Sequence, residues 1–422
     1  MLTVVAGINW GDEGKGRMVD YLGAGYDVVS RYQGGNNAGH TVINGRGKFV
    51  LNLLPSGVFN ENTANVLGPG MVIDLEHLYN EIEGLRSRGV PVTPDNLKLS
   101  GKAVICMPFH RDQDGLEEDR LGVKKQGSTR RGIGPVYADK YIRKALRVED
   151  IFDFAALRDK VCEYVEWKNL LLERGYGHKI REEEAYAWLR RYGSSLLPFV
   201  CDTGEYLEAA ANAGKNILFE AQLGALRDID YGIYPYTSSS TTLAAYAPIG
   251  AGIPGRRPDT VIGVIKAFSS CVGEGPFVAE MFGKEADNLR ETAEEYGAAT
   301  GRPRRVGGFD VPASAYGVRL QGADTLALTK LDILSGMERI PVCAAYEIDG
   351  VRTGSFPAMD KLLRAKPVVE LHEGFADDVS EARSFEDLPA AARKYVEFIE
   401  EAVGCHIGYI SVGARREQII VR

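Results

Sequence analysis

Short apolar runs alternate with turns and amphipathic segments along most of the 422 residues of the chain. Apolar residues at helical spacing predict helices at 74–88, 283–296 and 387–403, the first of them capped by Asp74. The expected strands are 2–6, 28–32, 66–68, 217–220, 261–268, 325–328, 342–348 and 406–411. This alternation predicts an α/β fold whose mainly parallel central sheet is flanked by helices.

Two stretches depart from the alternation. The runs 41–44 and 48–53 flank an Asn44-Gly45 pair, which predicts a β-hairpin. Residues 149–214 are charged, rich in Leu, Ala and Tyr, and periodic at helical spacing, which predicts a helical insertion. Because no repeat and no Pro/Ser-rich linker divides the chain, we expect residues 1–422 to form a single large domain with insertions.

The composition narrows the compartment and the partners. The formal net charge of −8 argues against nucleic-acid binding, and no apolar run approaches the roughly 18 residues that span a bilayer. The N-terminus lacks the basic start and the cleavage site of a signal peptide. Six scattered cysteines contain no CxxC pair. We therefore expect a cytoplasmic protein with reduced thiols that binds neither nucleic acid nor membrane.

The basic residues are unevenly placed. Eight of them lie between positions 124 and 147, accompanied by Asp139 alone: Lys124, Lys125, Arg130, Arg131, Lys140, Arg143, Lys144 and Arg147. Such a run is often a solvated basic face. The Gly-Ile-Gly-Pro turn expected at 132–135 favours the other interpretation, a local anion site in an acidic protein.

A glycine-rich loop follows the first expected strand and precedes a helix. Gly11, Gly14 and Gly16 would expose backbone N–H groups at a helix N-terminus, where anions are favoured, and Lys15 adds a cation for phosphate oxygens. The spacing differs from GxxxxGK[ST], so the loop alone is weak evidence for a nucleotide.

A second motif strengthens that evidence. The sequence Thr-Lys-Leu-Asp at 329–332 follows an apolar run and resembles the guanine-reading NKxD pattern of GTPases. A carboxylate at Asp332 could accept both hydrogen bonds from guanine N1 and N2, and the stem of Lys330 could lie over the base. The two motifs together predict a GTP site like that of P-loop NTPases.

Seven blocks, in order along the chain, resemble signature segments of the adenylosuccinate synthetase family. They are Trp-Gly-Asp-Glu-Gly-Lys-Gly at 10–16, Arg-Tyr-Gln-Gly-Gly-Asn-Asn-Ala-Gly-His-Thr at 31–41, Gly-Ile-Gly-Pro at 132–135 with Asp139-Lys140, Asp-Ile-Asp at 228–230, Tyr-Pro-Tyr-Thr-Ser-Ser at 234–239, Gly-Arg-Pro-Arg-Arg at 301–305 and Thr-Lys-Leu-Asp at 329–332. The first two blocks are highly specific, and the matches extend from residue 2 to about residue 415.

The resemblance implies a ligase that joins L-aspartate to IMP in purine biosynthesis. O6 of IMP would attack the γ-phosphate of GTP, and the aspartate amine would then displace phosphate from 6-phosphoryl-IMP to give adenylosuccinate. Asp12 would act as the base, His40 as an acid on the phosphoryl group, and Lys15 and Gln222 would complete the catalytic set. Mg²⁺ would bridge GTP, Asp12 and the Gly39 carbonyl. A helix N-cap role for Asp12 is the alternative.

The resemblance also implies two binding sets. The GTP set comprises Gly11, Glu13, Gly14, Gly16, Arg17, Gly39, Thr41, Arg305, Lys330, Leu331, Asp332, Ser411, Val412 and Gly413. The set for IMP and aspartate comprises Asn37, Ala38, Thr129, Arg143, Thr237, Ala299, Thr300, Gly301, Arg302, Pro303 and Arg304. Arg143 would reach the site of a second copy, so the resemblance implies a homodimer.

Several positions depart from the family pattern around the base and aspartate pockets. Where the family reads FEGAQG, residues 219–224 read Phe-Glu-Ala-Gln-Leu-Gly, which moves the glutamine by one place to Gln222. Thr237 and Ser238 compete for one role, and other departures occur at Ala299, Arg130, Ser240 and Gly308. A strand shift would turn Gln222 to the opposite face, but a bulge could re-aim it. A related purine or amine substrate and a non-catalytic GTP-binding regulator are the alternative hypotheses.

Overall fold

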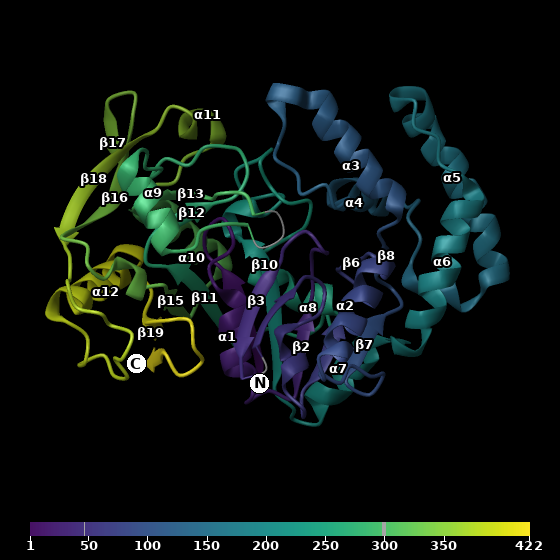
Figure 1. Cartoon of the computed structure of the whole chain (residues 1–422), viewed down its shortest axis with the longest axis horizontal. Coiled ribbons are helices and arrows are strands. Elements are labelled where there is room, and N and C mark those ends of the chain that lie inside the picture. Colours follow the sequence, from purple (N-terminus) through teal and green to yellow (C-terminus); the bar gives the residue numbers. More distant parts are fainter. Residues whose placement is uncertain (46, 298–300) are drawn as a thin grey trace.

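A ten-stranded sheet forms the centre of the molecule in the computed structural model, which describes residues 1–45, 47–297 and 301–422 (Figure 1). In spatial order its strands are β20 (Ile419–Val421), β19 (Ile407–Ser411), β15 (Thr325–Thr329), β11 (Thr260–Lys266), β1 (Leu2–Gly7), β10 (Ile217–Gly224), β2 (Val28–Arg31), β5 (Ala64–Leu67), β7 (Leu97–Ser100) and β9 (Val200–Cys201). Of these pairings only β19 with β20 is antiparallel. The predicted α/β class is confirmed.

Helices cover both faces of the sheet because its central strands are mostly apolar; every residue of β1 is buried. The helices next to the strands include α1 (Lys15–Gly23), α7 (Thr203–Asn212), α8 (Ala247–Ala251), α10 (Val311–Gln321) and α12 (Ala390–Val403). Helix α2 (Leu75–Ser87) begins at the predicted cap, since the Asp74 side chain accepts a hydrogen bond from the His77 amide. No helix in the described part of the chain is long and apolar enough to cross a membrane.

A second sheet lies beside the C-terminal half of the central one (Figure 1, left). It consists of β14 (Phe309–Asp310), β16 (Arg339–Ile348), β17 (Val351–Thr353) and β18 (Lys366–Glu373). The expected strand 342–348 forms β16 and therefore does not belong to the central sheet. Buried residues of β16 are interspersed with exposed and half-buried ones, as is typical of a strand with one solvated face.

The predicted hairpin is confirmed as β3 (His40–Asn44) and β4 (Gly47–Leu51), which pair antiparallel. The helix expected over 283–296 is shorter, because α9 spans Lys284–Thr292 and a tight turn with Glu294 at φ 50° follows it. The remaining short strands are β6 (Val72–Ile73), β8 (Val104–Ile105), β12 (Ser269–Cys271) and β13 (Arg305–Gly307), and a short helix α11 spans Met359–Leu362.

Four helices form the other flank of the molecule: α3 (Pro108–Leu121), α4 (Ile133–Tyr141), α5 (Phe154–Tyr176) and α6 (Glu182–Leu196) (Figure 1, right). The expected turn at 132–135 is wrong: Gly132, at φ 77°, is the N-cap of α4, and the helix begins at Ile133. Glycine reaches this left-handed conformation without a steric penalty, which explains why a helix starts inside a glycine-rich stretch.

One buried carboxylate joins three of these helices. Asp139 Oδ2 of α4 lies 3.0 Å from His110 Nε2 of α3 and accepts hydrogen bonds from Tyr164 and Lys168 of α5, at 2.5 and 2.6 Å. All four side chains are buried. We call these residues the Asp139 cluster; it docks α5 against α3 and α4, and α4 lies within the basic run 124–147.

Candidate functional site

Two adjoining cavities lie where β1, β2 and β10 end, which is the usual ligand position in an open parallel sheet. The larger has a volume of about 970 Å³ and the smaller about 180 Å³. Asp12, Ala38, Gly39 and Leu223 line both cavities. A molecule in the large cavity and one in the small cavity would therefore meet at these residues.

The glycine-rich loop lies between β1 and α1, as predicted. Gly14 is the N-cap of α1 at φ 98°, and no side chain caps this helix. Glu13 closes the loop by accepting the amides of Asn9 and Gly11, at 3.1 and 2.7 Å, and it pairs with Lys15 Nζ at 2.6 Å. The N-cap alternative for Asp12 is therefore wrong, and its carboxylate faces the cavities.

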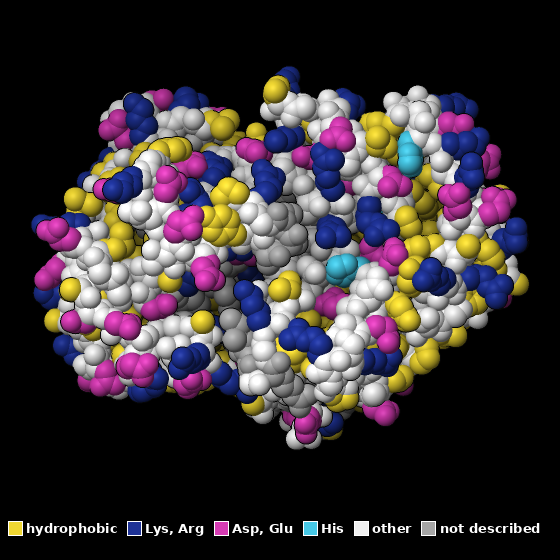
Figure 2. All heavy atoms as spheres, viewed as in Figure 1, with side chains coloured by type: hydrophobic (Ala, Val, Ile, Leu, Met, Phe, Trp, Pro, Cys, Tyr) yellow, Lys and Arg dark blue, Asp and Glu magenta, His cyan; other side chains and the backbone are white. Residues whose placement is uncertain are grey.

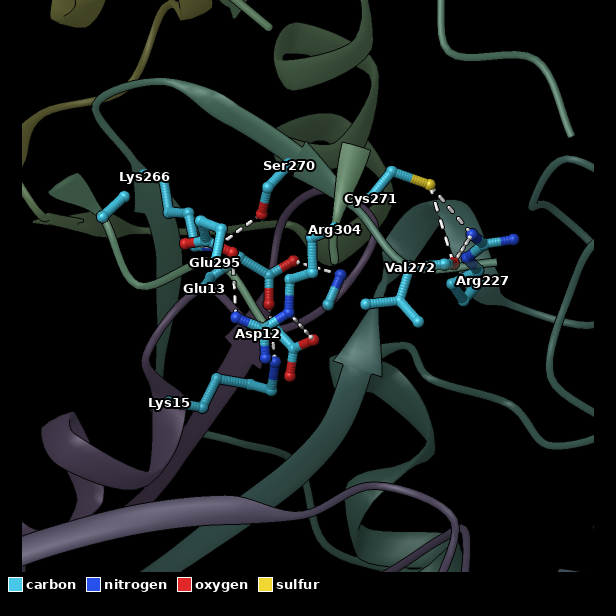
Figure 3. A network of polar contacts seen from close by, with 12 residues as sticks. Asp12, Glu13, Lys15, Arg227, Lys266, Ser270, Cys271, Val272, Glu295 and Arg304 are labelled. Atoms are coloured by element: carbon cyan, nitrogen blue, oxygen red, sulfur yellow. Dashed lines mark hydrogen bonds and ion pairs between the residues drawn. The ribbon is translucent and has the colours of Figure 1, made fainter. Parts of the chain in front are cut away.

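An arginine holds the Asp12 carboxylate. Arg304 Nε lies 3.1 Å from Asp12 Oδ2, and Arg304 Nη1 donates to Glu295 Oε2 at 2.8 Å (Figure 3). Arg304 also lines the small cavity. The resemblance assigns Arg304 to the set for IMP and aspartate, and the structure places its side chain beside Asp12 of the glycine-rich loop.

His40 begins β3 and lies against the first turn of α1. A Cβ at Gly16 would come within 2.7 Å of His40 Cδ2, so this close approach requires glycine. Burial lowers the pKa of His40 well below its usual value, and the nearby Arg31 and Lys15 lower it further. These effects favour the neutral imidazole.

The shifted glutamine lies in a bulge of β10. Val5 of β1 pairs with Glu220 and Gly7 with Gly224, so four steps on β10 oppose two on β1. Leu223, at φ 59°, takes up part of the excess. Gln222 lines the small cavity, where Nε2 donates to the Gly35 carbonyl at 2.8 Å and Oε1 is buried without a hydrogen-bond partner.

The large cavity contains most residues expected for the acceptor nucleotide. Asn37, Ala38 and Thr129 line it together with Arg302, and Thr237 and Ser238 both lie on its wall. Arg227 also lines it, buried, and donates to the carbonyls of Tyr236 and Val272 and contacts the Cys271 thiol (Figure 3).

The segment 329–332, which was predicted to read guanine, stands at the end of β15, next to β19. The Leu331 amide donates to the Ser411 carbonyl at 3.2 Å, which brings the 329–332 and 411–413 segments together. Burial lowers the pKa of Arg17 to about 10, although nearby Asp332 raises it. Lys330 lines the small cavity, and its Nζ donates to the Ala293 carbonyl and to Glu295, at 2.7 and 2.6 Å.

Other predicted residues do not reach the cavities. Arg305, the first residue of β13, pairs with Glu280 and donates to the Gly275 carbonyl at 2.7 Å, whereas the preceding Arg304 lines the small cavity. Arg143 is exposed and lines neither cavity. The predictions for Ala299 and Thr300 lie outside the described residues.

Sequence reasoning did not single out four residues that matter for the geometry: Arg31, Arg227, Leu223 and Glu295. Arg31 and Glu220, which both line the small cavity, interrupt otherwise apolar strands, and a charge inside a buried strand was the available signal. Leu223 and Glu295 carry no comparable local signal, since their positions depend on the bulge of β10 and on the turn after α9.

The residues proposed for magnesium occupy the junction of the cavities. Asp12 supplies a carboxylate and Gly39 a backbone carbonyl there. Among the described residues, no group of three or more His, Cys, Asp or Glu side chains forms a metal cage. One carboxylate beside a phosphate pocket nevertheless fits Mg²⁺, which is commonly bound by one or two carboxylates together with substrate phosphates.

Comparison with known proteins assigns the family. The family model for adenylosuccinate synthetase matches residues 4–420. The chain belongs to the adenylosuccinate synthetase family. It is accordingly a GTP-dependent ligase that converts IMP and aspartate to adenylosuccinate in purine biosynthesis.

The similarity to members of this family covers the whole chain. An adenylosuccinate synthetase from Caldanaerobacter subterraneus subsp. tengcongensis is 44% identical over 100% of this chain and 99% of its own length. Adenylosuccinate synthetase 2 from Pseudoalteromonas translucida is 46% identical over 99% of each chain. The solved structure of fully ligated adenylosuccinate synthetase from Plasmodium falciparum superimposes with a TM-score of 0.94 at 34% identity, covering 100% of this chain and 99% of that one.

Proposed function

We propose that the two cavities carry out the family reaction in two steps, with IMP in the large cavity and the phosphates of GTP in the small one. The observation that supports this assignment is the position of Asp12 on the wall shared by both cavities. A base there can reach the purine while it faces the phosphoryl group. The neighbouring carboxylate of Glu13 is not available as this base, because it accepts hydrogen bonds from the Asn9 and Gly11 amides.

In the first step, Asp12 removes the N1 proton of IMP, and O6 attacks the γ-phosphorus of GTP. The bond from phosphorus to the β-phosphate bridging oxygen breaks, which gives 6-phosphoryl-IMP and GDP. In the second step, the aspartate amine attacks C6 and the phosphate leaves with the former O6. Lys15 and Arg31 face the spreading phosphate charge in the small cavity.

His40 acts as an acid on the phosphoryl group in this proposal. The cations that hold the pKa of His40 low are Arg31 and Lys15, after burial itself. The negative phosphates of bound GTP oppose these cations and raise the pKa toward neutrality. Asp12 and the Gly39 carbonyl would hold Mg²⁺, which supplies charge neutralisation on the phosphate oxygens.

We propose that the Gln222 side chain donates a hydrogen bond to O6 of IMP. Gln222 uses one N–H on the Gly35 carbonyl and has a second available for O6 of the purine. Gln222→Ala is expected to lower turnover with IMP by about 10²-fold with little change in the KM for GTP. GTP cleavage supported by another purine monophosphate, but not by IMP, would replace this proposal with the related-substrate alternative.

A substitution at Asp332 tests whether this residue recognises the guanine base of GTP. Asp332→Asn should shift the preference from GTP toward xanthosine triphosphate, because the amide donates where xanthine offers a carbonyl. Steady-state kinetics with both nucleotides measure the shift. An unchanged preference for GTP would remove Asp332 from base recognition, and IMP- and aspartate-dependent phosphate release with mass analysis of the product checks the reaction itself.

The proposal extends to assembly and location. We propose a homodimer in which the exposed Arg143 enters the partner's large cavity, and a cytoplasmic protein, for which the six free cysteines are support. Residues 1–422 are proposed as one domain with 149–214 as its helical insertion. Within that range β9 pairs with β7, so part of the insertion extends the central sheet.

A further inference from the structure

Glu295 lies in the turn after α9 and is fully buried, yet neither motif analysis nor the reaction assigns it a role. Oε1 accepts hydrogen bonds from Lys266 and Lys330, at 2.7 and 2.6 Å, and Oε2 accepts one from Arg304 at 2.8 Å (Figure 3 shows Lys266 and Arg304). We call these four residues the Glu295 cluster. Among the residues that the structure describes, its carboxylate is the one group that contacts both Lys330 and Arg304 through side chains.

The two oxygens of Glu295 address different ends of the nucleotide site. Lys330 belongs to the guanine-reading segment, and its backbone is held at φ 60°, a left-handed conformation that is costly for a lysine. Arg304 reaches Asp12 with its other donor. A backbone hydrogen bond also joins Glu295 to Arg304, since the Arg304 amide donates to the Glu295 carbonyl at 2.9 Å.

The charges of this region do not balance within the protein. Lys266, Lys330 and Arg304 carry three positive charges, and Glu295 and Asp12 carry two negative ones, which leaves one positive charge beside the small cavity. Buried charges without compensation are costly, so an anion in this cavity is favoured. Both Lys330 and Arg304 line the cavity.

We propose that Glu295 is a positioning residue that holds Lys330 and Arg304 from one carboxylate, so that the guanine end and the γ-phosphate end of the GTP site keep a fixed spacing. The inference rests on the proposed placement of GTP. Without the carboxylate, Lys330 loses the anionic partner of its ammonium group and keeps the Ala293 carbonyl, and Arg304 keeps Asp12 as its carboxylate partner. Both changes oppose productive GTP binding, one at each end.

Glu295→Gln tests the proposal in the full-length enzyme with GTP, MgCl₂, IMP and aspartate. The expected result is an increase in the KM for GTP and a decrease in kcat, each of about 10- to 100-fold, the effect of losing hydrogen bonds to a charged group. Lys330→Met should raise the KM for GTP as well. If the two residues act together, the double variant is no worse in this KM than Glu295→Gln alone.

The matched control is Asp139→Asn, which removes the charge of another buried carboxylate with three donors but touches neither cavity. It should lose stability and keep the KM for GTP within about twofold. Equal effects of Glu295→Gln and Asp139→Asn on this KM would show a merely structural role and overturn the proposal. Additive effects of Glu295→Gln and Lys330→Met would also overturn it.

Glu295→Asp covers the case in which the glutamine variant does not fold. It keeps the charge but is one methylene shorter, so it cannot hold Lys330 and Arg304 at the same distance. It should fold and raise the KM for GTP; wild-type KM and kcat in this variant would overturn the proposal. Failure of the proposed function is distinguishable, because wild type would then release no phosphate from GTP with IMP and aspartate.

Discussion

Two buried carboxylates with three donors each serve different purposes in the two halves of this molecule. In the Asp139 cluster, Lys168 balances the charge of Asp139, because burial lowers the pKa of His110 to about 4 and leaves it neutral, although Asp139 opposes the shift. In the Glu295 cluster, the cations outnumber the carboxylates even when Asp12 is included.

The difference shows that charge balance, rather than burial or the number of hydrogen bonds, separates a docking contact from a binding site. For both carboxylates burial favours a raised pKa, and the surrounding donors outweigh it, so the pKa of each is lowered. Only the Glu295 cluster leaves a positive charge next to a cavity. Figure 2 shows acidic and basic side chains interspersed on the outer face, so this local excess is not visible from the surface shown.

The largest expected effects come from replacing Asp12, the cavity-facing carboxylate beside Arg304, and His40. Asp12→Asn and His40→Asn should each lower kcat by about 10²- to 10⁴-fold, because both remove a proposed proton-transfer group. Phosphate release with IMP and aspartate measures the loss, and circular dichroism checks that the fold persists. Near-normal turnover in either variant would exclude that residue from the mechanism.

The next effect concerns the other half of the molecule. Asp139→Asn should lower the free energy of unfolding by about 3–5 kcal/mol, since it leaves Lys168 buried without its anion. Urea denaturation at pH 7 measures this value. A loss below about 1 kcal/mol would show that the cluster contributes little to docking α5.

Mixing two inactive variants tests whether Arg143 acts in the site of a second copy. Arg143→Leu and Asp12→Asn chains should both be inactive as homodimers, whereas hybrids should recover about a quarter to a half of wild-type activity, because one complete site forms per hybrid. Subunit exchange is checked with differently tagged chains. Hybrids that form without recovering activity would contradict a shared site.

The smallest expected effect is a pH dependence in the Glu295 cluster. Burial lowers the pKa of Lys266 to about 8, with Lys330 and Arg304 lowering it further and Glu295 and Asp12 opposing them. As the pH rises through 8, Lys266 loses its charge and the positive excess disappears, so GTP affinity should weaken roughly twofold to fivefold.

The effect on stability has the opposite sign. The folded pKa of Lys266 lies below its ordinary value of 10.5, so the contribution of this group to stability rises between pH 8 and 10.5 and is lost as the pH falls through that range.

Lys266→Met tests the pH dependence of GTP binding. This variant should remove the alkaline weakening of GTP binding, measured by calorimetric titration from pH 7 to 9. The same weakening in Lys266→Met would contradict the assignment to Lys266.

Local sequence was sufficient for the elements whose structure depends on neighbours in the chain. The apolar run before 11–16 and the glycines within it determined the β1–loop–α1 unit, and the Asn44-Gly45 pair determined the hairpin. Hydrophobic periodicity likewise located most strands of the central sheet, but not β7, β9 and β20. These features follow from backbone sterics and side-chain period, which act over a few residues.

Only the tertiary structure decided which side chains meet. It gave Arg304 rather than Arg305 to the small cavity, placed Leu223 between the cavities through the bulge of β10, and assembled the Glu295 cluster from segments distant in sequence. The clearest case is Glu295 itself, because Lys266 ends β11, Arg304 precedes β13 and Lys330 follows β15. The pairing of buried charges depends on how those elements pack, and no sequence period encodes that spacing.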